Sequence, residues 1–128
     1  MIVMKEKLIA IKSIDADPIM EQLRFDYKQW KLNQKQNKNG FFIIYNDLFT
    51  SGKLKELNSN SLKVYIYLGI HSNNDTGESW HSVETIAKYF EMDKRTISRA
   101  LKNLEEINLI SRVQKGFRRV ANTFLMPY

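Results

Sequence analysis

Residues 82–119 place the tightest constraint on the fold, because helical and extended patterns follow one another there in a fixed order. Ser82 can cap a helix, and the apolar residues after it recur at the spacing of one helix face. Residues 91–92 interrupt this spacing. Asp93 can then cap a second helix by accepting backbone N–H groups of its first turn. The segment therefore predicts two short amphipathic helices joined by a tight turn.

The second of these helices has two chemically distinct faces. Apolar residues share one face and are expected in the core: Ile97, Ala100, Leu101, Leu104 and Ile107. The other face carries hydrogen-bond donors, concentrated in the first half of the helix: Lys94, Arg95, Thr96, Ser98, Arg99, Lys102 and Asn103. Helices that read DNA bases place such side chains in their N-terminal half, so these residues form the candidate site.

A two-stranded hairpin is predicted after this helix. Asn108 is expected to end the helix in the left-handed conformation, which asparagine tolerates. Strands are expected over residues 109–113 and 120–125, with Gly116 in the turn, where a positive φ is easiest. Four basic residues of the hairpin suit contact with phosphates or with the minor groove: Arg112, Lys115, Arg118 and Arg119.

The predicted fold class is α+β, in the form of a winged helix-turn-helix, because two helices, a tight turn and a basic hairpin follow in that order. This fold has a three-helix core and a β-hairpin wing. The third core helix is expected from Ser59 or Ser61 to residue 70, and it is apolar on most sides. Residues 41–45 are strand-like and are expected to pair with the hairpin as a third strand. Residues 72–77 predict a polar loop.

Residues 1–40 form an N-terminal strand and helix extension to this predicted domain of residues 41–128. Residues 7–12 alternate as a short strand, and Asp17-Pro18 is typical of a helix start. An apolar stripe follows on this helix: Met20, Leu23, Tyr27 and Trp30. Residues 31–39 are predicted as a basic linker. Two interpretations stay open: the helix packs on the winged domain, or it is an arm for homodimerisation or for binding a partner protein.

The net charge of +6 is unevenly distributed. Residues 1–40, 41–80 and 81–128 carry +3, −1 and +4 respectively. Within residues 94–119, eight basic residues stand against Glu105 and Glu106. Charge alone indicates only a solvated basic face. Charge that coincides with a helix-turn-helix pattern favours double-stranded DNA as the partner.

Six stretches of residues 41–128 follow the pattern of a known family. They are YNDLF at 45–49, SLKVYIYL at 61–68, TGESWHS at 76–82, TIA at 85–87, TISRAL at 96–101 and LE at 104–105. In these stretches the chain resembles the winged helix-turn-helix domains of plasmid and phage replication initiators and of related small regulators from Gram-positive bacteria. The resemblance implies the same fold. His81 stands where that family often has proline, and Asn108 where glycine is usual, and a turn tolerates both.

Several other functions lack their sequence signals. The chain has no cysteine, which excludes disulfides and thiolate metal sites and fits a reducing cytoplasm. His71 and His81 flank the polar loop, but no ligand pair has the spacing of a helical metal site and no nucleophile–base pair is suggested. No apolar run predicts a signal peptide or a membrane span. We therefore expect a cytoplasmic binding protein without enzyme activity, cofactor, metal or membrane association.

Two functions fit these features. The first is a sequence-specific regulator of transcription from a plasmid, phage or other mobile element. The second is a DNA-binding or adaptor component of plasmid or phage replication initiation. The lack of a second predicted domain favours the first. A winged helix used only for protein contacts is a third interpretation, and the arginines on the predicted reading helix and wing count against it.

Overall fold

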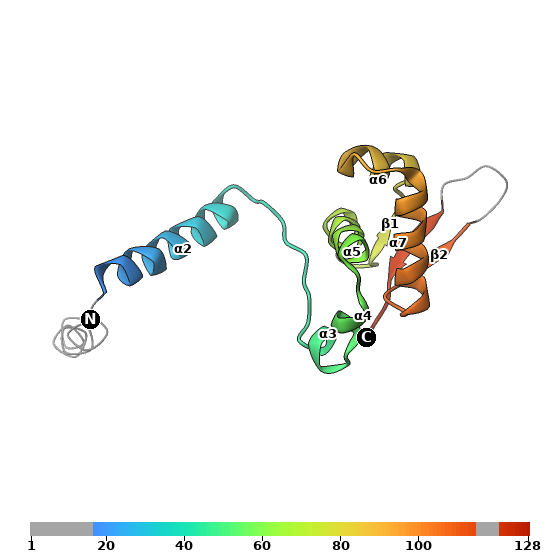
Figure 1. The fold of residues 1–128 in the computed structure, drawn as a ribbon. Coiled ribbons are helices and arrows are strands. Elements are labelled where there is room, and N and C mark those ends of the chain that lie inside the picture. Colours follow the sequence, from blue (N-terminus) through green and yellow to red (C-terminus); the bar gives the residue numbers. More distant parts are fainter. Residues whose placement is uncertain (1–16, 115–120) are drawn as a thin grey trace. The chain divides into compact units, whose positions relative to one another are not determined.

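The computed structural model describes residues 17–114 and 121–128 of the 128-residue chain. The chain divides into two units, Met1–Gly40 and Phe41–Tyr128 (Figure 1). The N-terminal unit contains helix α2 (Pro18–Gln36). The C-terminal unit contains helices α3 (Asp47–Thr50), α4 (Lys53–Glu56), α5 (Ser59–His71), α6 (Val83–Phe90) and α7 (Lys94–Glu106), with strands β1 (Glu78–Ser79), β2 (Ile110–Val113) and β3 (Asn122–Leu125).

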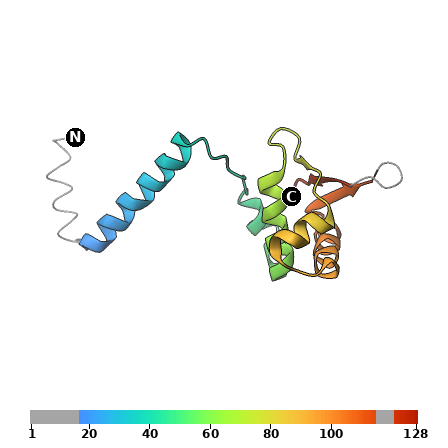
Figure 2. The same cartoon turned by 90° about the horizontal axis from the view of Figure 1, so that it is seen from above.

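Helices α5, α6 and α7 form the core of the C-terminal unit. Helix α7 packs against both α5 and α6, and its other neighbour is strand β2 (Figures 1 and 2). The side chains at the centre are fully or almost fully buried: Val64, Tyr65, Leu68, Ile86, Ile97, Leu101, Leu104 and Leu109. The predicted three-helix core with a hairpin is therefore confirmed. Helix α5 lies centrally, as predicted. It is not buried on all sides, because Ile66 and Ile70 are exposed to solvent.

Local hydrogen bonds set the ends of the two helices that were predicted first. The Ser82 hydroxyl accepts the Thr85 N–H at 3.1 Å, and the Asp93 carboxylate accepts the Arg95 N–H at 3.5 Å. Both predicted caps are confirmed. Between them, Glu91 adopts a left-handed φ of 54°, and the Met92 N–H reaches back to the Ala87 carbonyl at 3.0 Å. This reversal makes the tight turn between α6 and α7.

Asn108 ends α7 as predicted, with a φ of 60°. Its N–H donates to the Glu105 carbonyl at 3.0 Å, and the Leu109 N–H donates to the Leu104 carbonyl at 3.0 Å. These two bonds define a Schellman motif, in which an apolar contact usually joins the two outer residues. Leu104 and Leu109 are both fully buried. The motif therefore turns the chain from α7 into β2 with its carbonyl groups satisfied.

The sheet has three antiparallel strands in the order β1-β3-β2. Thr123 on β3 lies opposite Ser79 on one side and opposite Arg112 on the other. The two predicted hairpin strands are confirmed over residues 110–113 and 122–125. The predicted third strand was wrong, because β1 occupies the free edge of β3 and residues 41–45 form no strand.

The apolar run at residues 41–45 has a different use. Phe41 is 75% exposed, and of these five residues only Phe42 packs against the core. The Phe42 ring meets the Tyr65 ring edge-on, with 5.6 Å between centroids. It also covers Gly69, where any Cβ would overlap the ring. The run therefore inserts one aromatic side chain over α5, which needs no strand pairing.

Helix α2 starts as predicted but runs further. The Asp17 carboxylate accepts the Ile19 N–H at 2.9 Å, and Pro18 takes the first helical position. The prediction of a linker over residues 31–39 was wrong for residues 31–36, which continue the helix. The physical reason is that lysine and glutamine are good helix formers. None of its residues is buried. The strand expected at residues 7–12 lies outside the described residues.

No helix within residues 17–114 and 121–128 combines the length and the apolar character that crossing a membrane requires.

Candidate nucleic-acid interface

Helix α7 is held by one face and presents the other to solvent. Ile97, Ala100, Leu101 and Leu104 are buried against the rest of the core. The structure leaves five of the predicted site residues on this helix exposed: Lys94, Arg95, Ser98, Arg99 and Lys102. Thr96 and Asn103 are half-buried at the edges of this face. The helix is therefore anchored along its length while its polar face stays open to a ligand.

Three cations define what we call the α7 basic face: Arg95, Arg99 and Lys102. They are spaced by four and three residues, so they lie on successive turns of one helix side. Among the residues that the structure describes, no ion pair involves any of them. Lys94 differs, because its ammonium lies 3.8 Å from the Glu84 carboxylate, with both side chains more than 60% exposed. Such an exposed pair is weak and does not compete strongly with a phosphate.

Arg112 occupies a less open position than its assignment to the wing suggested. It lies opposite Thr123 on β3, and opposed residues of an antiparallel pair project from the same face of the sheet. Thr123 is buried, as is Ile110 two residues before Arg112. Arg112 is half-buried, and its Nε has no hydrogen-bond partner among the described residues. Its side chain therefore starts from the buried face of the sheet and is only partly accessible to solvent.

The other three wing residues, Lys115, Arg118 and Arg119, lie outside the described residues. Their contacts with a nucleic acid remain predictions from the sequence. The described strands on either side of this segment are β2 and β3, which pair at Val113 and Asn122.

Two histidines that are ten residues apart come together beside α6, which sequence spacing did not reveal. The rings of His71 and His81 have centroids 4.5 Å apart. The Tyr67 hydroxyl lies 2.6 Å from Nδ1 of His81, and Nδ1 of His71 donates to the Tyr67 carbonyl at 2.8 Å. In the part of the chain that the structure describes, no third metal-ligating side chain joins them. Tyr89 and Phe90 of α6 complete an aromatic cluster around Tyr67.

This cluster predicts a pH-dependent stability. Burial, and then the neighbouring His71, lower the pKa of His81 below its usual 6.5. The unfolded chain therefore binds more protons than the folded chain near that pH, and stability falls as the pH falls through 6.5. We expect a lower urea midpoint at pH 5.5 than at pH 7.5. His81→Gln, which keeps an acceptor for Tyr67, should reduce this difference, and His71→Gln should reduce it less. An unchanged difference in His81→Gln would contradict the assignment.

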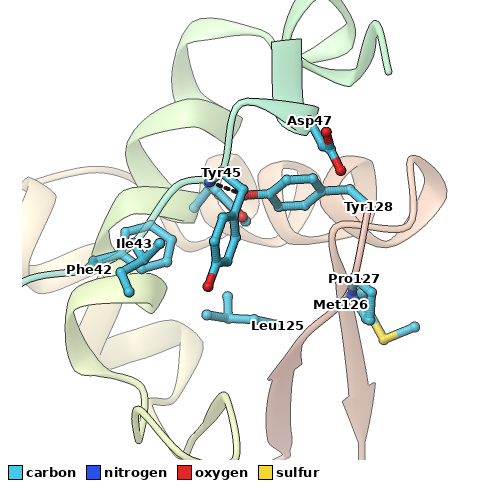
Figure 3. A pocket seen from close by; sticks show the side chains of 9 residues that line it. Phe42, Ile43, Tyr45, Asp47, Leu125, Met126, Pro127 and Tyr128 are labelled. Atoms are coloured by element: carbon cyan, nitrogen blue, oxygen red, sulfur yellow. Dashed lines mark hydrogen bonds between the residues drawn. The ribbon is translucent and has the colours of Figure 1, made fainter. Parts of the chain in front are cut away.

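A cleft of about 450 Å³ lies on the C-terminal unit between residues 42–47 and the C-terminal residues 125–128 (Figure 3). The Tyr45 N–H donates to the Tyr128 hydroxyl at 2.7 Å. Burial, and then the adjacent Tyr128, raise the pKa of Tyr65 to about 12, so its phenol stays protonated. Among the described residues that line the cleft, Asp47 is the one with a charged side chain. The cleft is mainly apolar and contains no residue of the α7 basic face, so it does not suit a phosphate backbone.

Comparison with known proteins agrees with this architecture. Residues 55–110 match the model of a helix-turn-helix domain family. A solved structure of a Rep–DNA complex is 21% identical, with a TM-score of 0.52, and the match covers 73% of this chain and 80% of that chain. The N-terminal domain of a DNA-binding protein is 21% identical, with a TM-score of 0.53, and the match covers 73% and 79%. No curated protein matches the chain.

The family match spans α5, α6 and α7, and ends where β2 begins. It therefore contains the α7 basic face and both predicted helix caps. The structural matches cover more of the chain than the family model does. The C-terminal unit therefore has a winged helix-turn-helix fold, similar to that of the Rep protein in that complex.

Proposed function

We propose that the C-terminal unit binds double-stranded DNA sequence-specifically, with α7 in the major groove. The observation that carries this proposal is the α7 basic face. Arg95, Arg99 and Lys102 share one exposed side of a helix whose opposite side is buried. The major groove of B-DNA accommodates one α-helix, and arginine can make two hydrogen bonds to guanine there. The Rep–DNA complex of similar fold supports the same ligand.

The remaining predicted site residues have supporting roles in this proposal. Lys94, Thr96, Ser98 and Asn103 lie beside the α7 basic face and suit further contacts to bases or phosphates. Three wing residues would contact phosphates or the minor groove: Lys115, Arg118 and Arg119. Arg112, which is half-buried on β2, would make the same kind of contact with the accessible part of its side chain. The proposed role is non-catalytic, needs no cofactor, and belongs in the cytoplasm, where bacterial DNA lies.

For the biological role, we propose transcriptional regulation in a plasmid, phage or other mobile element. Replication initiation is the second candidate. The observation that supports this second role is the structural similarity to a Rep–DNA complex. A genome-wide footprint separates the two. Sites at promoters would support regulation, whereas clustered repeats at a replication origin would support initiation.

We further propose that the protein acts as a homodimer through α2. Its apolar side chains are exposed, and Met20, Leu23, Tyr27 and Trp30 share one side of the helix. Two winged units on one duplex would imply repeated half-sites about one helical turn apart. A regulatory or replication protein that binds the same helix is the alternative partner.

Affinity for duplex DNA should fall steeply with salt. Each phosphate neutralised by lysine or arginine releases condensed counterions, so several contacts imply a log–log slope of about −4 or steeper. This slope can be measured by fluorescence anisotropy with a labelled duplex at about 50 to 300 mM salt, where the log–log dependence is linear. Lys102→Ala should make the slope shallower by about one. A flat dependence would point to a protein as the ligand instead.

A further inference from the structure

Helix α2 exposes a row of large apolar side chains to solvent. None of its 19 residues is buried, and its exposed residues include Leu23, Tyr27 and Trp30. Most helical stability in proteins comes from packing an apolar face against other parts of the structure, rather than from intrinsic helix propensity. The apolar face of α2 is therefore suited to packing against another helix.

The apolar side chains follow a heptad pattern. Met20, Leu23, Tyr27 and Trp30 are separated by three, four and three residues, which assigns them to positions a, d, a and d. They are between 43% and 61% exposed. The rings of Tyr27 and Trp30 lie 5.7 Å apart and continue one seam. Such a seam packs against another helix by inserting each side chain between four residues of its partner.

The charges beside this seam distinguish between possible orientations. Arg24 and Lys31 follow the two d residues and occupy position e, whereas Asp26 precedes Tyr27 and occupies position g. In a parallel pair, position g of one helix faces position e of the other, five residues later, so Asp26 faces Lys31 of the second copy. In an antiparallel pair, e faces e and g faces g, which brings like charges together.

We propose that α2 forms a parallel two-stranded coiled coil with a second copy of this chain, in the register that pairs Asp26 with Lys31. This inference deepens the homodimer of the proposed function and does not depend on DNA binding. Arg24, Lys28, Lys31 and Lys35 lie on one flank of the seam, so two such flanks repel in any antiparallel arrangement. Phe25 and Leu32 occupy position f, on the far side of the helix, and stay outside the seam.

Two leucines of the same helix test the seam. Leu23 occupies position d and Leu32 occupies position f, and both are exposed in one copy. Leu23→Ala should raise the dimer dissociation constant of the full-length protein by about ten-fold or more, as removal of a buried leucine does. Leu32→Ala should change it by less than about two-fold, as is usual for a surface substitution. Sedimentation equilibrium measures both, and equal effects would overturn the assignment of the seam.

Single cysteines test the orientation, because the natural chain has none. In a parallel pair each residue of the seam lies beside the same residue of the other copy. Met20→Cys should therefore form a disulfide-linked dimer in a glutathione redox buffer. An antiparallel pair would instead link Met20→Cys only to Trp30→Cys in a mixture of the two variants. That result would overturn the parallel arrangement.

A charge exchange tests the register. Asp26→Lys and Lys31→Asp each place like charges opposite one another in their own homodimers, and both should dimerise more weakly than the natural chain. The double variant should recover the dimer.

A membrane surface is the alternative partner for the apolar face of α2. In the full-length Trp80→Phe variant, Trp30 is the one tryptophan, so its fluorescence reports on α2 alone. If this protein stays monomeric and its fluorescence shifts when anionic phosphatidylglycerol vesicles are added, the dimer proposal is overturned in favour of a membrane surface. None of these measurements contains DNA, so their failure leaves DNA binding untouched.

Discussion

Ile97→Ala should lower the free energy of unfolding of the C-terminal unit by about 2–5 kcal/mol. Ile97 is 0% exposed and lies on the face of α7 that packs against the core. Its truncation removes buried methyl groups and leaves a cavity that the closely packed helices fill only in part. A domain of this size is stabilised by about 5–15 kcal/mol in total, so this one change removes a large fraction of it.

The matched control for this prediction is the neighbouring residue. Ser98 lies on the exposed side of the same helix, and Ser98→Ala should change the stability by no more than about 0.5 kcal/mol. Urea unfolding followed by far-UV circular dichroism compares the two variants with the natural chain. If Ile97→Ala unfolds at the same urea concentration as Ser98→Ala, the buried face of α7 has been assigned wrongly.

Arg95→Ala and Arg99→Ala should each weaken binding to the specific DNA site about 10- to 100-fold more than binding to random DNA. Both residues lie in the first half of α7, one turn apart, and both are exposed. In the proposed complex they reach base edges, where a two-hydrogen-bond contact to guanine is worth about 1–3 kcal/mol of discrimination. Because neither side chain is buried, folding should be unaffected.

Lys63→Ala serves as the matched control, since Lys63 is an exposed cation on α5 and lies on neither α6 nor α7. Titrations of each variant against the specific and a scrambled duplex, at one salt concentration, separate base reading from attraction to phosphates. Should both arginine variants lose equal affinity on the two duplexes, α7 does not read bases. Specificity would then come from the wing, from the N-terminal unit or from DNA shape.

Much of the C-terminal unit could be predicted because its signals are local. Ser82, Asp93 and Asn108 act on backbone groups within five residues of themselves, and the structure shows all three in the predicted roles. The amphipathic spacing of residues 97–104 likewise identifies which side of α7 is buried, because a helix repeats every 3.6 residues regardless of what it packs against. The α7 basic face follows from the same spacing.

Other features depend on which segments meet, and local patterns do not contain that information. Residues 41–45 have strand propensity, but Glu78–Ser79 pairs with the edge of β3 instead. Strand propensity is strongly context-dependent, so packing against the core decides which segment pairs with that edge. His71 and His81 come together because the chain between them turns back on itself, with the Asn73 N–H donating to the Glu78 carbonyl at 2.9 Å. Arg112 has the charge expected of a wing residue, and only its register opposite the buried Thr123 shows that its side chain starts from the inner face of the sheet.

The amino-acid sequence alone thus determines the ends of α6 and α7, the buried and exposed sides of α7, and the heptad pattern of α2, because each depends on neighbours within about two helical turns. The tertiary structure decides the third strand, the histidine cluster and the accessibility of Arg112. These depend on contacts between residues that are distant in the chain, where packing of the whole core selects one pairing among several that local propensity allows.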